Sequence, residues 1–237
     1  MKPIFLSSLL LRGWQSLVFI LTLGVSMSAC SSMTWKEEVL LHDGQKIIVK
    51  RSQSYGGRHE IGQTPPIKEQ EITFTGPNTN KTVTFKSEYG EDIGRASFNL
   101  LALHVLNGTP YLIVEPNLCL SYNKWGRPNP PYVFFKHDGK AWQRIPLSEF
   151  PVEFKNINLI VSTLSDVKKL PSHGLVSAEM VRELNSSLKQ PEYKTILREP
   201  LAKERINAMC EERVLYKGHW ILPDDPIARK FIDRQER

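Results

Sequence analysis

The sequence has no apolar run long enough to cross a bilayer. A membrane-spanning helix needs about 20 consecutive apolar residues, whereas the apolar stretch at residues 17–25 is shorter and follows Gln15 and Ser16. The chain also lacks a strongly basic region, because its net charge is only +6 and its lysines and arginines are spread along the whole length. A nucleic-acid-binding domain usually gathers such charges into one patch or stripe. The composition therefore argues against a helical integral membrane protein and against a nucleic-acid partner.

Recognisable catalytic and metal-binding motifs are also missing. His59-Glu60 begins like the helical zinc-protease motif, but Gln63 stands at the second ligand position and Pro65-Pro66 argue against a helix. No Gly-x-Ser-x-Gly elbow occurs. We expect no catalytic residue, no metal and no cofactor. Residues 54–63 are interpreted as a long surface connection, with a functional glycine-rich loop as the alternative. The six histidines share no ligand spacing; they are His42, His59, His104, His137, His173 and His219.

The N-terminus, in contrast, has the three parts of a secretory signal. Lys2 and Arg12 precede the apolar stretch at residues 17–25, small residues follow it, and the first acidic residue is Glu37. A positive flank, a short apolar segment and small residues before a cleavage point are typical of an export signal. A buried N-terminal helix is the alternative, but a basic start without acidic residues is unusual for a core helix.

Met27-Ser28-Ala29-Cys30 resembles the lipobox of bacterial prolipoproteins, with Met27 where leucine is commoner. The resemblance covers residues 1–30 alone. It implies cleavage before Cys30, a thioether-linked diacylglycerol on the Cys30 sulfur and an acyl group on the new amine. Two or more acyl chains anchor a protein stably. Ser31 resembles an outer-membrane sorting signal, so we expect a lipid-anchored protein at the periplasmic face of the outer membrane.

Two cysteines remain once Cys30 is acylated, namely Cys119 and Cys210. Disulfides persist in exported proteins, and two cysteines allow one pairing. A bridge between them would close a loop of about 90 residues, worth roughly 4–5 kcal/mol in the loop-entropy model. Two separate buried thiols are the alternative. Cys119 lies between Leu118 and Leu120, an apolar context that argues against a nucleophile.

The body is predicted to be a series of short strands joined by tight turns. Apolar and polar residues alternate through residues 71–75 and 81–85, which indicates one buried and one wet face. Asp43-Gly44 and Asp138-Gly139 each separate two apolar runs, as tight hairpins do. The fold class predicted is α+β, mainly β, with an antiparallel sandwich or barrel-like meander. Further strands are expected at residues 37–41, 46–50, 100–106, 111–114, 132–136, 141–145 and 158–162.

The composition changes after residue 165, where helical patterns begin. A helix is expected at residues 177–188, with Ser177 as its N-cap and Pro191 after its end. A second helix is expected within residues 200–213 and a charged one at residues 227–237. In the second, the side chains expected to face inward are Leu201, Ile206, Met209 and Cys210. The chain thus divides into a cleaved signal peptide (1–29), a lipidated tether (30–35), a β-rich body (36–165) and a helical segment packed on it (166–237).

Residues 120–136 combine aromatic and polar side chains with three prolines. Rigid aromatic side chains lose little entropy on binding and present flat faces with polar tips. Arg127 could pair with a carboxylate, such as that of a cell-wall peptide. Aromatics that simply close the end of the β core are the alternative. The predicted binding patch consists of Tyr122, Trp125, Arg127 and Tyr132.

These features predict a membrane-anchored lipoprotein of the bacterial cell envelope with a non-enzymatic binding or structural role. Its expected partners are the membrane, through the lipid, and an envelope protein or glycan, with no nucleic acid. Two alternatives remain open. One is an envelope hydrolase acting on peptidoglycan or peptide, for which His59 and Glu60 are candidates. The other is an accessory or inhibitor of another exported protein that acts through an edge strand or loop.

Overall fold

The computed structural model describes residues 32–77, 81–161, 170 and 174–235. The predicted signal peptide and Cys30 lie outside the described residues. Within the described ranges, no helix has both the length and the apolar composition that crossing a membrane requires.

The first sheet is built from hairpin-connected strands whose apolar residues alternate. Four strands pair antiparallel in chain order, and a short fifth strand adds in parallel to the first, giving the order β11-β1-β2-β3-β4. In β2, Ile47 and Val49 are buried while Ile48 and Lys50 are exposed, as a period of two requires. The strands are β1 (Ser32–Leu40), β2 (Lys46–Tyr55), β3 (Ile67–Thr75), β4 (Thr82–Ser87) and β11 (Leu175–Val176).

The second sheet is an antiparallel meander with the strand order β10-β9-β8-β7. A register shift between Leu100 and Ala102 marks an irregularity in β7. As a result, the residues that face the first sheet are Leu100 before the shift and Leu103 and Val105 after it. The strands are β7 (Phe98–Leu106), β8 (Thr109–Pro116), β9 (Val133–His137) and β10 (Trp142–Ile145).

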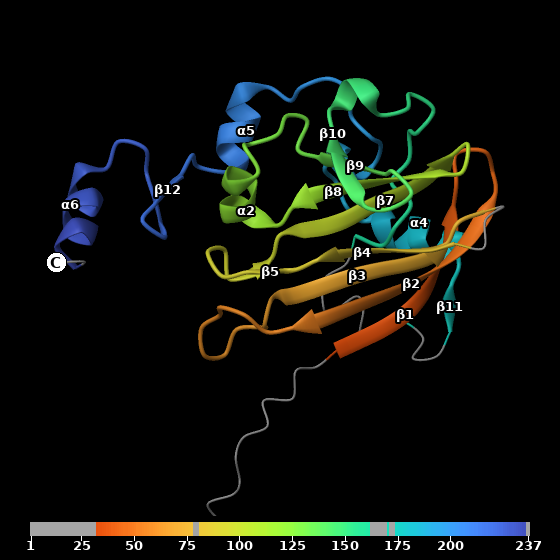
Figure 1. Ribbon diagram of the computed structural model, residues 1–237, viewed down its shortest axis with the longest axis horizontal. Coiled ribbons are helices and arrows are strands. Elements are labelled where there is room, and N and C mark those ends of the chain that lie inside the picture. The colour runs from red at the N-terminus through yellow and green to blue at the C-terminus, as the bar shows by residue number, and fades with distance from the viewer. Residues whose placement is uncertain (1–31, 78–80, 162–169, 171–173, 236–237) are drawn as a thin grey trace, which may run out of the picture. The chain divides into compact units, whose positions relative to one another are not determined.

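The two sheets pack face to face around the main hydrophobic core (Figure 1). Ile72 and Phe74 from the first sheet share this core with Leu112 and Val114 from the second. The outer face of the second sheet carries another core, in which irregular chain around Phe150 covers the strands. Both faces of β7 and β8 are therefore buried, which explains their nearly continuous apolar sequences. The predicted mainly β, α+β class with an antiparallel sandwich is confirmed.

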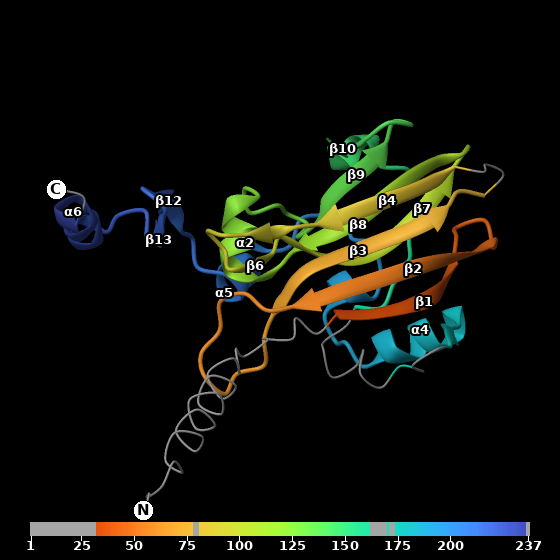
Figure 2. The same cartoon turned by 60° about the horizontal axis from the view of Figure 1, so that its bottom comes forward.

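Helices are short and most of them follow the sheets in the chain. Ser177 caps α4 by accepting a hydrogen bond from the backbone N–H of Met180 at 3.3 Å, as predicted. This helix packs against β1 (Figure 2). The helices are α2 (Leu118–Lys124), α4 (Ala178–Ser186), α5 (Lys203–Met209) and α6 (Pro226–Gln235), with 3-10 turns η1 (Leu147–Glu149) and η2 (Pro191–Tyr193).

Several predicted boundaries are wrong. Residues 32–35 belong to β1 and not to a tether, because Trp35 is buried in a small core with Val176 and Val181. The C-terminal segment is not purely helical, since it contains the hairpin of β12 (Val214–Tyr216) and β13 (His219–Ile221). A two-stranded ribbon of β5 (Tyr89–Gly90) and β6 (Arg95–Ala96) was also not predicted.

The strand predicted at residues 158–162 is not formed over its described residues, 158–161. The N–H of Leu159 donates to the carbonyl of Leu101 at 3.1 Å, but its neighbours bind side chains and no ladder of backbone partners forms. The N–H of Ile160 donates to Glu37 Oε2 at 3.2 Å, and the N–H of Val161 donates to Asn185 Oδ1 at 3.0 Å. These side chains satisfy the backbone of an extended segment that covers the sheet edge.

One end of the first sheet has a polar inward face. Glu37 and Arg51 are 0% and 1% exposed, and Arg51 Nη1 donates to Glu37 Oε1 at 3.1 Å. The same oxygen accepts from Trp35 Nε1 at 2.7 Å. Burial raises the pKa of Glu37, and Arg51 opposes that rise. Because Trp35, Arg51 and the N–H of Ile160 all donate to this carboxylate, the pair is a buried salt bridge.

Arg51→Met should destabilise the fold by about 3–5 kcal/mol, because it leaves the Glu37 carboxylate buried without its cation. The double variant Glu37→Leu/Arg51→Met should recover a large part of that loss. Denaturant unfolding followed by tryptophan fluorescence measures both effects. Lys46→Met, which breaks the exposed pair with Glu38, is the control and should change little. An Arg51→Met protein that unfolds at the wild-type midpoint would contradict the structural role of the pair.

Candidate functional site

A disulfide ties the C-terminal segment to the end of the second sheet. Cys119 and Cys210 are joined as predicted, with their Cα atoms 5.2 Å apart across 91 residues of sequence. Cys119 belongs to α2, which follows β8 almost directly, and Cys210 is the C-cap of α5. Tyr122 and Ile206 pack beside the bridge. The bridge therefore fixes α5 next to α2.

The predicted aromatic patch is not exposed. Tyr122 and Tyr132 are only 5% and 3% exposed, and their hydroxyls donate to the carbonyls of Pro128 and Glu192 at 2.9 and 2.7 Å. Trp125 is half-buried, with its ring 4.4 Å from that of Phe98. Residues 118–124 form a helix that turns Tyr122 toward the core, so the alternative applies and these aromatics close the end of the β body.

Arg127 is occupied by contacts within the protein. Its Nη2 donates to the carbonyl of Cys210 at 2.9 Å, and its Nη1 donates to Asn123 Oδ1 at 3.1 Å. The guanidinium also lies 5.3 Å from the centre of the Tyr122 ring. These contacts hold α2 against the end of α5, so Arg127 has a structural role.

The hydrolase candidates His59 and Glu60 lie on the surface in the connection between β2 and β3. Both are exposed and bind within their own loop. The Nδ1 atom of His59 lies 2.8 Å from the carbonyl oxygen of Gly57, and Glu60 Oε2 accepts from Gln63 Nε2 at 3.1 Å. No group of three or more His, Cys, Asp and Glu side chains able to hold a metal occurs in the described part of the chain.

A cleft of about 460 Å³ lies where the end of β8 meets α2, η2 and α5, and we call it the outer cleft. Its walls are mainly apolar, and Leu118 and Met209 are 61% and 41% exposed. The exposure of Met209 corrects its predicted inward position on α5. The lining residues are Glu115, Pro116, Leu118, Cys119, Tyr122, Pro131, Gln190, Glu192, Tyr193, Arg205, Met209 and Cys210.

Two acidic side chains form the polar part of the outer cleft. Glu115 Oε1 accepts a hydrogen bond from the Tyr193 hydroxyl at 2.9 Å and a longer one from Asn99 Nδ2 at 3.5 Å. Glu192, which is nearly fully buried, accepts from Arg205 Nη2 at 2.9 Å. The Nε–H of Arg205 is buried and has no acceptor among the described residues. The cleft thus offers an unused donor beside a buried carboxyl.

Glu115 can change its charge near neutral pH. Burial raises the pKa of its carboxyl to about 7, although the hydrogen bond from Tyr193 works in the opposite direction. Burial and the nearby Glu115 raise the pKa of Tyr193 well above its ordinary value, so the hydroxyl keeps its proton and acts as the donor. A carboxyl poised in this way in a cleft is a common feature of binding and catalytic sites.

A second cavity of about 200 Å³, the inner cavity, shares Glu115 and Tyr193 with the outer cleft. Polar side chains from the inward face of β2 and β3 enter it. Polar residues in the inward phase of an alternating strand are the sequence signal that could have found it. The lining residues are Arg51, Gln53, Ile67, Gln70, Asn99, Leu100, Glu115, Ile160, Val161, Leu188 and Tyr193.

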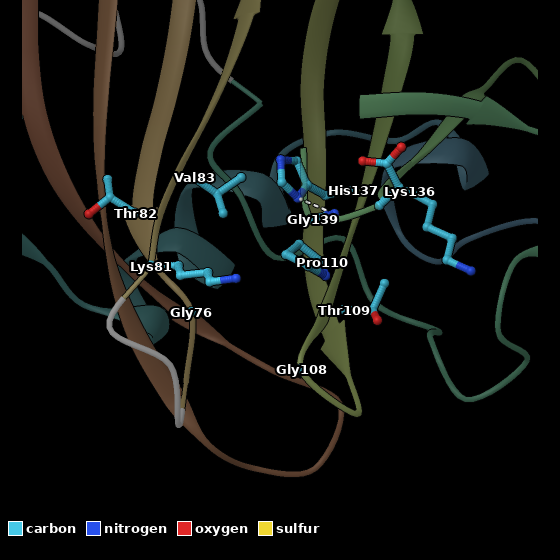
Figure 3. A pocket seen from close by; sticks show the side chains of 11 residues that line it. Gly76, Lys81, Thr82, Val83, Gly108, Thr109, Pro110, Lys136, His137 and Gly139 are labelled. Atoms are coloured by element: carbon cyan, nitrogen blue, oxygen red, sulfur yellow. Dashed lines mark hydrogen bonds between the residues drawn. The ribbon is translucent and has the colours of Figure 1, made fainter. Parts of the chain in front are cut away.

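A third cavity, of about 720 Å³, lies among the hairpin tips at the other end of β8 (Figure 3). It contains Lys81, Lys136 and His137, but the two lysines do not point at a common centre, since the Lys136 side chain extends away from Lys81 (Figure 3). The Nδ1 atom of His137 accepts a hydrogen bond from the N–H of Gly139 at 3.1 Å. The outer cleft and inner cavity, in contrast, hold several buried polar groups that face one another.

The arrangement around Glu115 is suited to binding. Leu118 and Met209 offer apolar contact, while Glu115 and Arg205 offer one acceptor and one donor. An apolar wall with a few placed polar groups is typical of small-molecule sites. Sequence analysis missed the site because its polar members, which lie on β8, η2 and α5, come together only in the fold.

Glu115→Gln should change how stability depends on pH. The folded-state pKa of about 7 lies above the ordinary value of 4.5. Glu115 therefore stabilises the fold while protonated, and that contribution is lost as pH rises through about 7. Between about pH 5 and pH 8 the wild type should lose up to about 3 kcal/mol relative to Glu115→Gln. Denaturant unfolding at several pH values measures this difference.

Glu204→Gln, which removes an exposed carboxyl on α5, is the matched control and should follow the wild type. Parallel stability curves for wild type and Glu115→Gln would show that the Glu115 carboxyl is not perturbed.

The chain has no significant match to any protein-family model, curated protein or solved structure. The candidate site therefore rests on its own geometry.

Proposed function

We propose that this chain is a lipid-anchored protein of the bacterial cell envelope whose body binds an amphiphilic molecule in the outer cleft without catalysing a reaction. The observation that carries the proposal is the outer cleft itself, where Leu118 and Met209 lie beside Glu115 and the Glu192–Arg205 pair. An amphiphile would place its apolar part on Leu118 and Met209. Its polar group would lie near Glu115, Glu192 and Arg205.

The disulfide supports an exported location. Structural disulfides persist in oxidising compartments and are rare in the cytosol. The Cys119–Cys210 bridge forms part of the wall of the outer cleft, so the cleft keeps this wall only where the bridge is oxidised. This agrees with the export signal and with the lipobox-like Met27-Ser28-Ala29-Cys30.

The short connection to the anchor also fits a role at the membrane surface. The first sheet begins at Ser32, so Ser31 alone separates it from the proposed lipid attachment at Cys30. With Ser31 as the sorting residue, the proposed location is the periplasmic face of the outer membrane.

The polar end of the outer cleft defines what the ligand must offer. Glu115 Oε2 has no hydrogen-bond partner among the described residues, and neither has the Nε–H of Arg205. A ligand with one N–H or O–H donor and one acceptor oxygen would satisfy both. Leaving the buried Nε–H of Arg205 unpaired costs free energy, so the unpaired state favours binding.

Cys30→Ala should release the protein from the membrane, because the thioether-linked lipid cannot form. Fractionation of the producing cells should show the variant among soluble proteins and the wild type with the membranes. Cys119→Ala/Cys210→Ala is the control and should stay with the membranes. Membrane association of Cys30→Ala equal to that of the wild type contradicts the lipid anchor.

Met209→Gln should weaken binding of a neutral apolar amine dye, N-phenylnaphthylamine, by about tenfold, because it removes an apolar contact worth about 1.5 kcal/mol or more. Fluorescence titration of the detergent-solubilised protein measures this. Met180→Gln is the matched control, because Met180 on α4 is exposed to a similar extent, 38% against 41%, but lies outside the cleft. Equal loss in both variants, or no binding to the wild type, argues against the outer cleft.

A further inference from the structure

We propose that the inner cavity is a second binding compartment, which takes an uncharged polar group such as an amide or hydroxyl from the ligand held in the outer cleft. This inference rests on the proposed function, which it extends from an amphiphile in general to one with a neutral polar end.

The inner cavity contains a buried donor that nothing in the described chain satisfies. Arg51 is 1% exposed and lines the cavity, and its Nε–H has no acceptor. More than nine in ten buried polar groups in proteins have a hydrogen-bond partner, in the protein or in ordered water. An acceptor atom inside the cavity is therefore expected next to Arg51.

The charges around the inner cavity favour an uncharged ligand group. The positive charge of Arg51 is already balanced by Glu37 at 3.1 Å. A ligand cation would meet the guanidinium of Arg51, and a ligand anion would find that guanidinium already paired with Glu37, so either charge would be buried without a partner of its own. Gln53 donates to Gln70 and Asn99 donates to Glu115, so these side-chain amides make the wall polar without adding charge.

The inner cavity and the outer cleft are neighbours that share two side chains. Glu115 and Tyr193 line both, and the 2.9 Å hydrogen bond from the Tyr193 hydroxyl to Glu115 Oε1 lies where they meet. A ligand donor would add a bond to Glu115 Oε2 without breaking this one. A volume of about 200 Å³ corresponds to about six or seven water molecules at about 30 Å³ each, which is enough for a small polar group.

Three isosteric probes test the charge preference directly. Acetamide is neutral, acetate is an anion and acetamidine is a cation, and each gives one methyl signal. Saturation-transfer NMR on the full-length, detergent-solubilised protein should be run at about pH 5.5, where Glu115 is protonated. Acetamide should bind about tenfold more tightly than either charged probe, because burying an unpaired charge is unfavourable. Equal binding of the three probes, or preference for a charged one, overturns the inference.

Leu188→Trp locates the binding. The larger side chain should fill the inner cavity and abolish most of the acetamide signal, because Leu188 lines this cavity and not the outer cleft. Leu215→Trp, at an exposed position on β12, is the matched control and should keep the signal. An acetamide signal that survives in Leu188→Trp overturns the inference.

N-phenylnaphthylamine separates this inference from the proposed function. Dye binding without selective acetamide binding means that the outer cleft is functional and the inner compartment is not. Loss of dye binding in the wild type means that the proposed function itself fails. The order of the three probes on the wild-type protein remains decisive even where Leu188→Trp does not fold.

Discussion

The disulfide between Cys119 and Cys210 is the constraint on which the candidate site depends. It fixes the end of α5 to the start of α2, and both cysteines form part of the wall of the outer cleft. The neighbouring contacts point the same way, because Arg127 and Asn123 donate from the α2 side to the carbonyls of Cys210 and Glu211. The disulfide thus closes the long loop between Cys119 and Cys210 at the wall of the outer cleft. The proposed export of the protein and the shape of the outer cleft are linked through one disulfide.

The buried Glu37–Arg51 pair has a comparable role at the other side of Glu115. A salt bridge of this kind is seldom a net source of stability, because removing two charges from water offsets their attraction. Here it places a guanidinium in the inner cavity without giving that cavity a net charge. This explains how a polar end can exist in a sandwich whose remaining inward residues, such as Val49 and Ile72, are apolar.

Local sequence patterns predicted the hairpins because alternation and Asp-Gly turns act over a few residues. The β1–β2 hairpin and the cap at Ser177 follow from such signals. The site could not be predicted in this way, since Glu115 and Tyr193 are separated by 78 residues and meet only through packing. The exposure expected of the aromatic patch was wrong for a related reason. Residues 120–136 were interpreted as a binding patch, whereas residues 118–124 form a helix that buries Tyr122.

Two of the unsatisfied buried donors belong to residues that line the inner cavity and the outer cleft. Arg51 Nε lines the inner cavity and Arg205 belongs to the outer cleft, and both N–H groups lack acceptors within the described residues. Glu115 lies between them with a carboxyl whose pKa burial raises. Sequences that violate the rules of core packing usually do so at functional sites. The two unpaired donors beside these neighbouring cavities therefore favour a ligand that satisfies them.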